Sequence, residues 1–97
     1  MISVNLTDDE RKKLIEETNN LIHEENILKI DIYSLKEQMN RIGFVNRYMS
    51  PDNKELYRLM ETRVFNKSRR LLVVLKEIET NKKILELDKN NKKNKTL

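Results

Sequence analysis

Apolar residues recur along this chain with the spacing of two amphipathic helices. The first series is Leu14, Thr18, Leu21, Glu25, Leu28, Ile32, Leu35, Met39 and Ile42. The second series is Tyr57, Met60, Val64, Lys67, Leu71, Val74, Ile78, Asn81 and Leu85. Alternating steps of three and four residues keep each series on one side of a helix. We therefore predict one helix over residues 8–42 and a second over residues 51–88.

Local signals mark the ends of both predicted helices. Thr7 and Glu10 have the spacing of a capping box, in which each side chain accepts a hydrogen bond from the other residue's backbone N–H. Gly43 suits a left-handed helix stop. Ser50 followed by Pro51 is typical of a new helix start. These signals predict a short loop over residues 43–50 between the two helices.

The two series mirror each other about this loop. Leu14 and Leu85 are equally far from a point between residues 49 and 50, and Leu28 and Leu71 have the same relation. Folding the chain at the loop would set matching layers side by side. We therefore predict an all-α fold, an antiparallel two-helix hairpin that resembles a coiled coil.

The ends of the chain lack the helical pattern. Residues 1–7 alternate apolar and polar side chains, which predicts an extended arm. Residues 89–97 are rich in Lys and Asn and contain no apolar residue before the final Leu97. We therefore expect a disordered basic tail that contributes nothing to stability.

Apolar residues also occur outside the two series. A helical projection at 100° per residue adds Leu75 to the seam, which is the side of the second helix that faces the first. Other apolar residues fall on the flanks or on the far side of each helix. A hairpin of two helices cannot cover them, so we expect a homo-oligomeric helical bundle or docking on a larger protein. The predicted interface residues are Ile15, Ile22, Ile27, Ile30, Leu72 and Val73.

Composition narrows the class of protein. Charged residues make up 37% of the chain, Gly and Pro occur once each, and Cys is absent. This composition favours long helices and excludes disulfide and thiol chemistry. No apolar run is long enough for a membrane span and no signal peptide is evident, so we expect a cytoplasmic protein without membrane contact. The use of Lys, Asn and Ile suggests an AT-rich source such as a phage or plasmid.

Few residues suggest catalysis or metal binding. Glu25 and Lys67 occupy seam positions, where buried charges act as catalysts in small helical chorismate mutases but more often form a polar layer that fixes helix register. Glu25 would then pair with Arg70 or Lys76. His23, the only histidine, has no second ligand at metal-binding spacing. We therefore predict a non-enzymatic protein with no cofactor, no metal and no catalytic residue.

Basic residues gather around the loop and offer an alternative function. Aromatic residues lie among them, an arrangement typical of nucleic-acid contacts. The alternative nucleic-acid residues are Arg41, Arg47, Lys54, Arg58, Arg63, Lys67, Arg69 and Arg70. Over residues 31–56 the order Asp-Ile, Gly-Phe and Asp-Asn-Lys-Glu-Leu resembles GapR-type nucleoid proteins, although the loop here is longer. That resemblance implies DNA binding by helical oligomers, whereas the acidic first helix would neutralise part of the basic surface.

Taken together, these patterns favour a small helical interaction protein. We expect a regulator or inhibitor that binds itself and a larger protein through a helical face. The alternative is an oligomeric nucleic-acid-binding protein that uses the basic residues near the loop.

Overall fold

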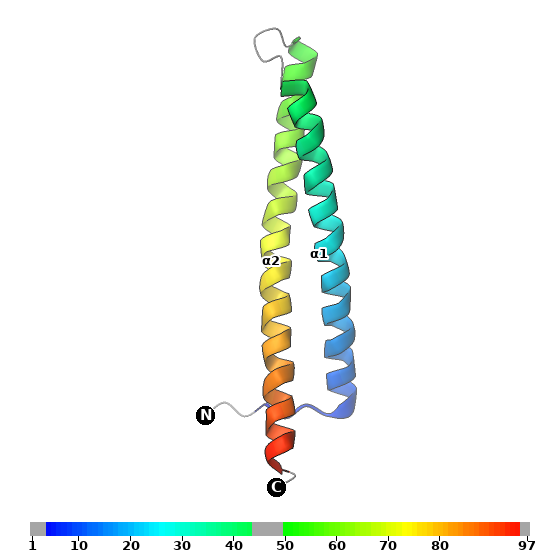
Figure 1. Ribbon diagram of the computed structural model, residues 1–97, viewed down its shortest axis with the longest axis vertical. Helices are drawn as coiled ribbons and strands as arrows, with labels where there is room; N and C mark the ends of the chain where they lie inside the picture. The colour runs from blue at the N-terminus through cyan, green and yellow to red at the C-terminus, as the bar shows by residue number, and fades with distance from the viewer. Residues whose placement is uncertain (1–3, 44–49, 96–97) are drawn as a thin grey trace. The chain divides into compact units, whose positions relative to one another are not determined.

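The computed structural model describes residues 4–43 and 50–95, which form two helices (Figure 1). Helix α1 spans Asp8–Gly43 and helix α2 spans Pro51–Lys95. No strand occurs within these two ranges. The predicted all-α hairpin of two packed helices is therefore confirmed, while its oligomeric state is a separate question.

The chain divides into two compact units, each containing part of both helices. The terminal unit contains residues 1–24 and 73–97, and the middle unit contains residues 25–72. Within each unit a stretch of α1 packs against a stretch of α2 that runs in the opposite direction (Figure 1). Each unit therefore has its own packing between α1 and α2.

The buried apolar side chains belong to the two predicted series. Leu21, Leu28 and Ile32 are the buried apolar residues of α1, and Val74 and Ile78 are those of α2. The 100° projection was wrong for Leu75, which is 37% exposed, whereas its neighbour Val74 is fully buried. The seven-residue repeat predicted the buried residues better than the 100° projection did, because packed helices bring every seventh residue back to the seam.

Both predicted helix starts have the expected hydrogen bonds. The Glu10 N–H donates to Thr7 Oγ1 and the Thr7 N–H donates to Glu10 Oε1, each at 3.2 Å. The Asn53 N–H donates to Ser50 Oγ at 3.2 Å. The expectation of a left-handed stop was wrong for Gly43, which is the last residue of α1, and no glycine within the described ranges has a positive φ.

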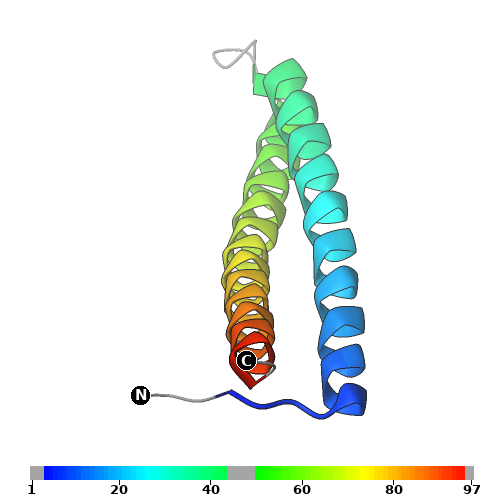
Figure 2. The same ribbon diagram turned by 60° about the horizontal axis from the view of Figure 1, so that its bottom comes forward.

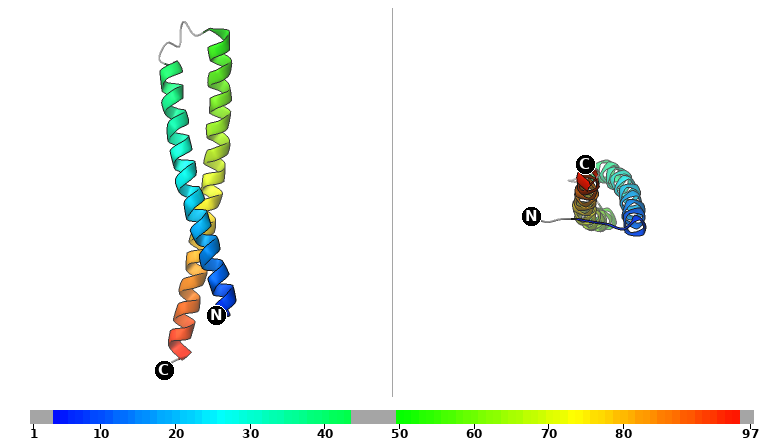
Figure 3. Two further views of the ribbon diagram at one scale, coloured as in Figure 1. Left: turned by 90° about the vertical axis from the view of Figure 1, so that its right-hand side faces the viewer. Right: turned by 90° about the horizontal axis from the view of Figure 1, so that it is seen from below.

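The far end of α2 differs from the sequence prediction. Instead of ending at Asp88 before a disordered tail, α2 continues to Lys95. Residues 4–7 lead from the start of α1 across to this part of α2 (Figure 2 and Figure 3, right). Asn91 Nδ2 donates to the Val4 carbonyl at 3.0 Å, and the Leu6 N–H donates to Asp88 Oδ1 at 2.9 Å. These contacts give the last turns of α2 a tertiary partner, which composition alone could not reveal.

Candidate functional site

Exposed apolar side chains are concentrated in the middle unit. Among the large apolar residues of this unit whose burial the structure describes, only Leu28 and Ile32 are buried. Seven others remain exposed: Ile27, Ile30, Tyr33, Leu56, Leu59, Phe65 and Leu72. Because two packed helices can cover only one stripe of each other, this surface is available to another molecule.

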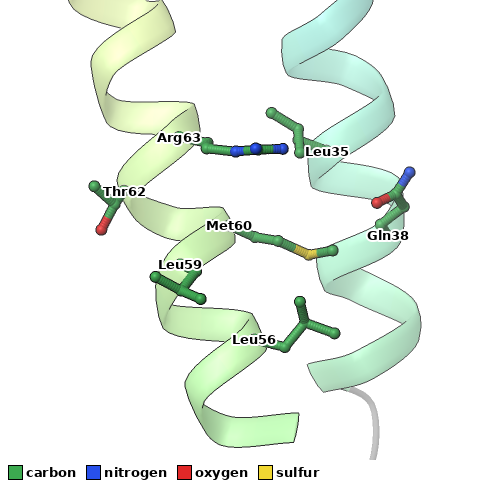
Figure 4. A pocket seen from close by; sticks show the side chains of 7 residues that line it. All are labelled: Leu35, Gln38, Leu56, Leu59, Met60, Thr62 and Arg63. Atoms are coloured by element: carbon green, nitrogen blue, oxygen red, sulfur yellow. The ribbon is translucent and has the colours of Figure 1, made fainter. Parts of the chain in front are cut away.

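A groove lies between α1 and α2 on this unit (Figure 4). Its cavity measures about 410 Å³. Leu35 and Gln38 line it from α1, and Met60 extends from α2 across the space between the helices. Leu56 and Leu59 also line it and are 42% and 55% exposed. The groove therefore has an apolar lining that is open to solvent.

A second cavity continues the groove along the same helices. It measures about 260 Å³ and shares Leu35 and Arg63 with the first cavity. Asp31, Ser34 and Lys67 complete its lining. On α2 the lining residues run from Leu56 to Lys67, a rise of about 16 Å at 1.5 Å per residue. The two cavities together match the length of about three helical turns.

Positive charge borders this groove. The Arg63 side chain reaches from α2 toward Leu35, above Met60 (Figure 4). Lys67 Nζ donates to Asp31 Oδ2 at 3.0 Å, so this pair joins the two helices at one end of the lining. Residues 25–72 contain ten basic and six acidic residues, whereas the rest of the chain contains ten of each. The whole net charge of +4 therefore belongs to the middle unit.

Other exposed residues of the middle unit face away from the groove. Tyr33 lies two residues before Leu35 and Phe65 two residues after Arg63, and two residues correspond to about 200° of helix rotation. Leu72 follows Phe65 by seven residues and shares its side of α2. The exposed fractions of these three side chains are 61–68%. We call Tyr33, Phe65 and Leu72 the outer residues.

The six predicted interface residues are divided equally between the two units. Ile27, Ile30 and Leu72 belong to the middle unit, and Ile15, Ile22 and Val73 to the terminal unit. All are exposed except Ile22, which is half-buried. Leu72 and Val73 are adjacent in sequence and therefore point about 100° apart. Tyr33, Leu59 and Phe65 are also exposed apolar residues, although they are not among the six predicted interface residues.

Several of the predicted nucleic-acid residues contact the protein itself. Lys67 pairs with Asp31, and Arg41 Nη2 lies 3.9 Å from Glu37 Oε2. The Arg69 guanidinium lies 5.7 Å from the centre of the Phe65 ring. Arg63 lines the groove, and its side chain is exposed, as are those of Lys54, Arg58 and Arg70. Arg47 lies outside the described residues.

The residues weighed for catalysis have ordinary surroundings. Glu25 is half-buried, and its Oε2 accepts a hydrogen bond from Lys29 Nζ at 2.6 Å. His23 is exposed. In the part of the chain that the structure describes, no three His, Cys, Asp or Glu residues are placed to hold a metal ion, and no helix is long and apolar enough to cross a bilayer.

The terminal unit contains a buried charge cluster that the sequence did not predict. Asp88 is completely buried, and its Oδ2 lies 3.4 Å from Lys92 Nζ and 3.9 Å from Arg11 Nε. The hydrogen bond from the Leu6 N–H, with help from these cations, lowers the pKa of Asp88 below its ordinary value of 3.8. The Thr7 hydrogen bonds likewise lower the pKa of Glu10. The cluster holds residues 4–7 against α2.

Comparison with known proteins found no relative from which a function can be transferred. No family model matches the chain, and no curated protein or solved structure is similar to it. Its function must therefore be inferred from its own residues.

Proposed function

We propose that the protein is a small non-enzymatic helical interaction protein, a regulator or inhibitor that binds a larger protein through the middle unit. The observation that carries this proposal is the excess of exposed over buried apolar side chains in residues 25–72. Exposed apolar surface of this kind is costly in water and is typical of protein interfaces.

The proposal extends to self-association. The groove and the outer residues lie on different sides of their helices, so the middle unit offers two surfaces. One surface would bind the larger protein, while the other would pack against a second copy in a helical bundle. Neither surface requires a cofactor, a metal or a catalytic residue.

Three matched substitutions test the proposal. Leu59→Glu places a charge in the groove lining, Leu72→Glu places one among the outer residues, and Leu87→Glu makes the same change on exposed α2 surface of the terminal unit. All three positions are exposed, so each variant should fold.

Affinity purification from a nuclease-treated lysate then compares these variants with the wild type. We expect a protein partner to remain bound to the wild type and to Leu87→Glu, and to be lost from Leu59→Glu or Leu72→Glu. A partner that all three variants retain would contradict a role for the middle unit.

Nucleic-acid binding is the second candidate, favoured by the +4 charge of the middle unit and by two exposed aromatic residues, Tyr33 and Phe65. It predicts the opposite result in the same experiment, because nuclease treatment would remove the bound molecule. The contacts of Lys67, Arg41 and Arg69 within the chain reduce the number of cations available for phosphates.

A further inference from the structure

We infer that the groove of the middle unit binds an acidic amphipathic helix of the partner protein. This inference rests on the proposed function and adds to it the chemistry and the conformation of the bound segment. It concerns the groove residues Leu35, Leu56, Leu59, Met60 and Arg63.

The dimensions of the groove favour a helix over a small molecule. Two neighbouring cavities, of about 410 and 260 Å³, follow one another along α1 and α2. Their lining on α2 runs from Leu56 to Lys67, about three helical turns. An amphipathic helix places apolar side chains on one face at steps of three and four residues, which suits an apolar groove of this length.

Charge complementarity selects an acidic helix. Arg63 lines both cavities, and ten of the residues in the middle unit are basic against six that are acidic. A carboxylate that flanks the apolar face of the bound helix would meet the Arg63 guanidinium, which forms strong charge-assisted hydrogen bonds. A second copy that placed its middle unit in the groove would bring like charge, so it is a weaker occupant than an acidic helix.

Synthetic peptides test this inference on the full-length protein. The probe is a fluorescein-labelled peptide of about 18 residues, or five helical turns, with Leu on one face and Glu on both flanks. One control peptide has Lys in place of every Glu, and the other has Ser in place of every Leu. Fluorescence anisotropy should show binding of the Leu/Glu peptide alone, weakening as salt is added.

Two charge reversals locate the bound peptide. Arg63→Glu should weaken binding by about tenfold or more, because it replaces a direct partner of the carboxylate with a like charge. Arg58→Glu changes the net charge equally but lies five residues away, about 140° around α2, and should weaken binding by less than about threefold. Both arginines are exposed, so neither change should unfold the protein.

Several results would overturn the inference. Equal binding of the Lys peptide or of the Ser peptide would show that acidic charge and apolar contact are not both required. If Arg63→Glu and Arg58→Glu weakened peptide binding equally, and weakened binding of a random DNA duplex to the same extent, the surface would be one that binds polyanions in general. Dimer formation by the wild type that Leu59→Glu abolishes would place a second copy in the groove. If the peptide fails while a lysate partner still depends on Leu72, the proposed function stands without this inference.

Discussion

Asn81 occupies a seam position that is otherwise suited to an apolar residue. Its side chain is buried, and its Nδ2 has no hydrogen-bond partner among the side chains and backbone that the structure describes. A buried donor without a partner costs about 1–3 kcal/mol. A single polar residue at such a position can nevertheless fix the register of packed helices.

We therefore expect Asn81→Leu to stabilise the protein. Removing the unpaired donor and adding apolar contact should raise the free energy of unfolding by about 1 kcal/mol, or the thermal midpoint by about 4–8 °C. Thr18→Val is the control, because Thr18 is also buried but already donates to the Leu14 carbonyl at 2.7 Å. Thermal unfolding followed by circular dichroism compares the two variants, and a lower midpoint for Asn81→Leu would contradict the expectation.

Asp88 should make the stability of the fold decrease as the pH falls into the acidic range. Its pKa is lowered in the folded state, chiefly by the Leu6 N–H hydrogen bond, so ionised Asp88 stabilises the fold above its ordinary pKa of 3.8. This contribution should be lost as the pH falls below that value toward the folded-state pKa. Asp88→Asn should lower the thermal midpoint at neutral pH and flatten its decline below pH 3.8. Glu86→Gln, on exposed surface of the same helix, should leave the decline unchanged.

At the scale of the elements, the last turns of α2 should contribute to stability. Deleting residues 89–97 removes Asn91 and Lys92, which contact Val4, Asp8 and Asp88. We expect the thermal midpoint to fall by more than about 5 °C, measured by calorimetry. Deleting only residues 93–97 keeps these contacts and should have a smaller effect. Equal thermal midpoints for both truncations and the full chain would support the sequence-based expectation that residues 89–97 contribute nothing to stability.

The two helices could be predicted from the sequence because their signals are local. The seven-residue spacing identified the seam, and Thr7, Glu10 and Ser50 identified the helix starts. The end of α2 could not be predicted in the same way, because a Lys-rich and Asn-rich segment resembles a disordered one. Two features of the sequence did indicate that α2 continues and contacts residues 4–7. Asp88 continues the seven-residue series of Val74 and Asn81, and residues 1–7 alternate apolar and polar side chains.

The groove was only partly predictable for a related reason. The sequence identified Arg63 and Lys67 as two of the basic residues around the loop, but it says nothing about their contacts across the hairpin. The structure separates their roles, since Lys67 pairs with Asp31 while Arg63 lines both cavities. Helix register and side-chain reach decide this difference, and both depend on contacts between residues far apart in the sequence.

At the scale of the whole molecule, net charge is distributed unevenly. The terminal unit is neutral, whereas the middle unit carries +4 and most of the exposed apolar surface. Apolar contact would favour joining two middle units, and like charge would oppose it. The opposition is screened by salt, while apolar contact is not.

Self-association through the outer residues should therefore strengthen with salt. Between about 50 and 500 mM salt the screening length falls from about 14 to about 4 Å, so sedimentation should show more dimer at the higher concentration. Leu72→Glu should stay monomeric under both conditions because it places a charge in the contact, whereas Leu87→Glu should behave as the wild type. Binding of an acidic helix or of nucleic acid should weaken over the same range. If the wild-type protein stays monomeric at high salt, the outer residues do not mediate self-association. They would then be assigned to the interface with the larger partner.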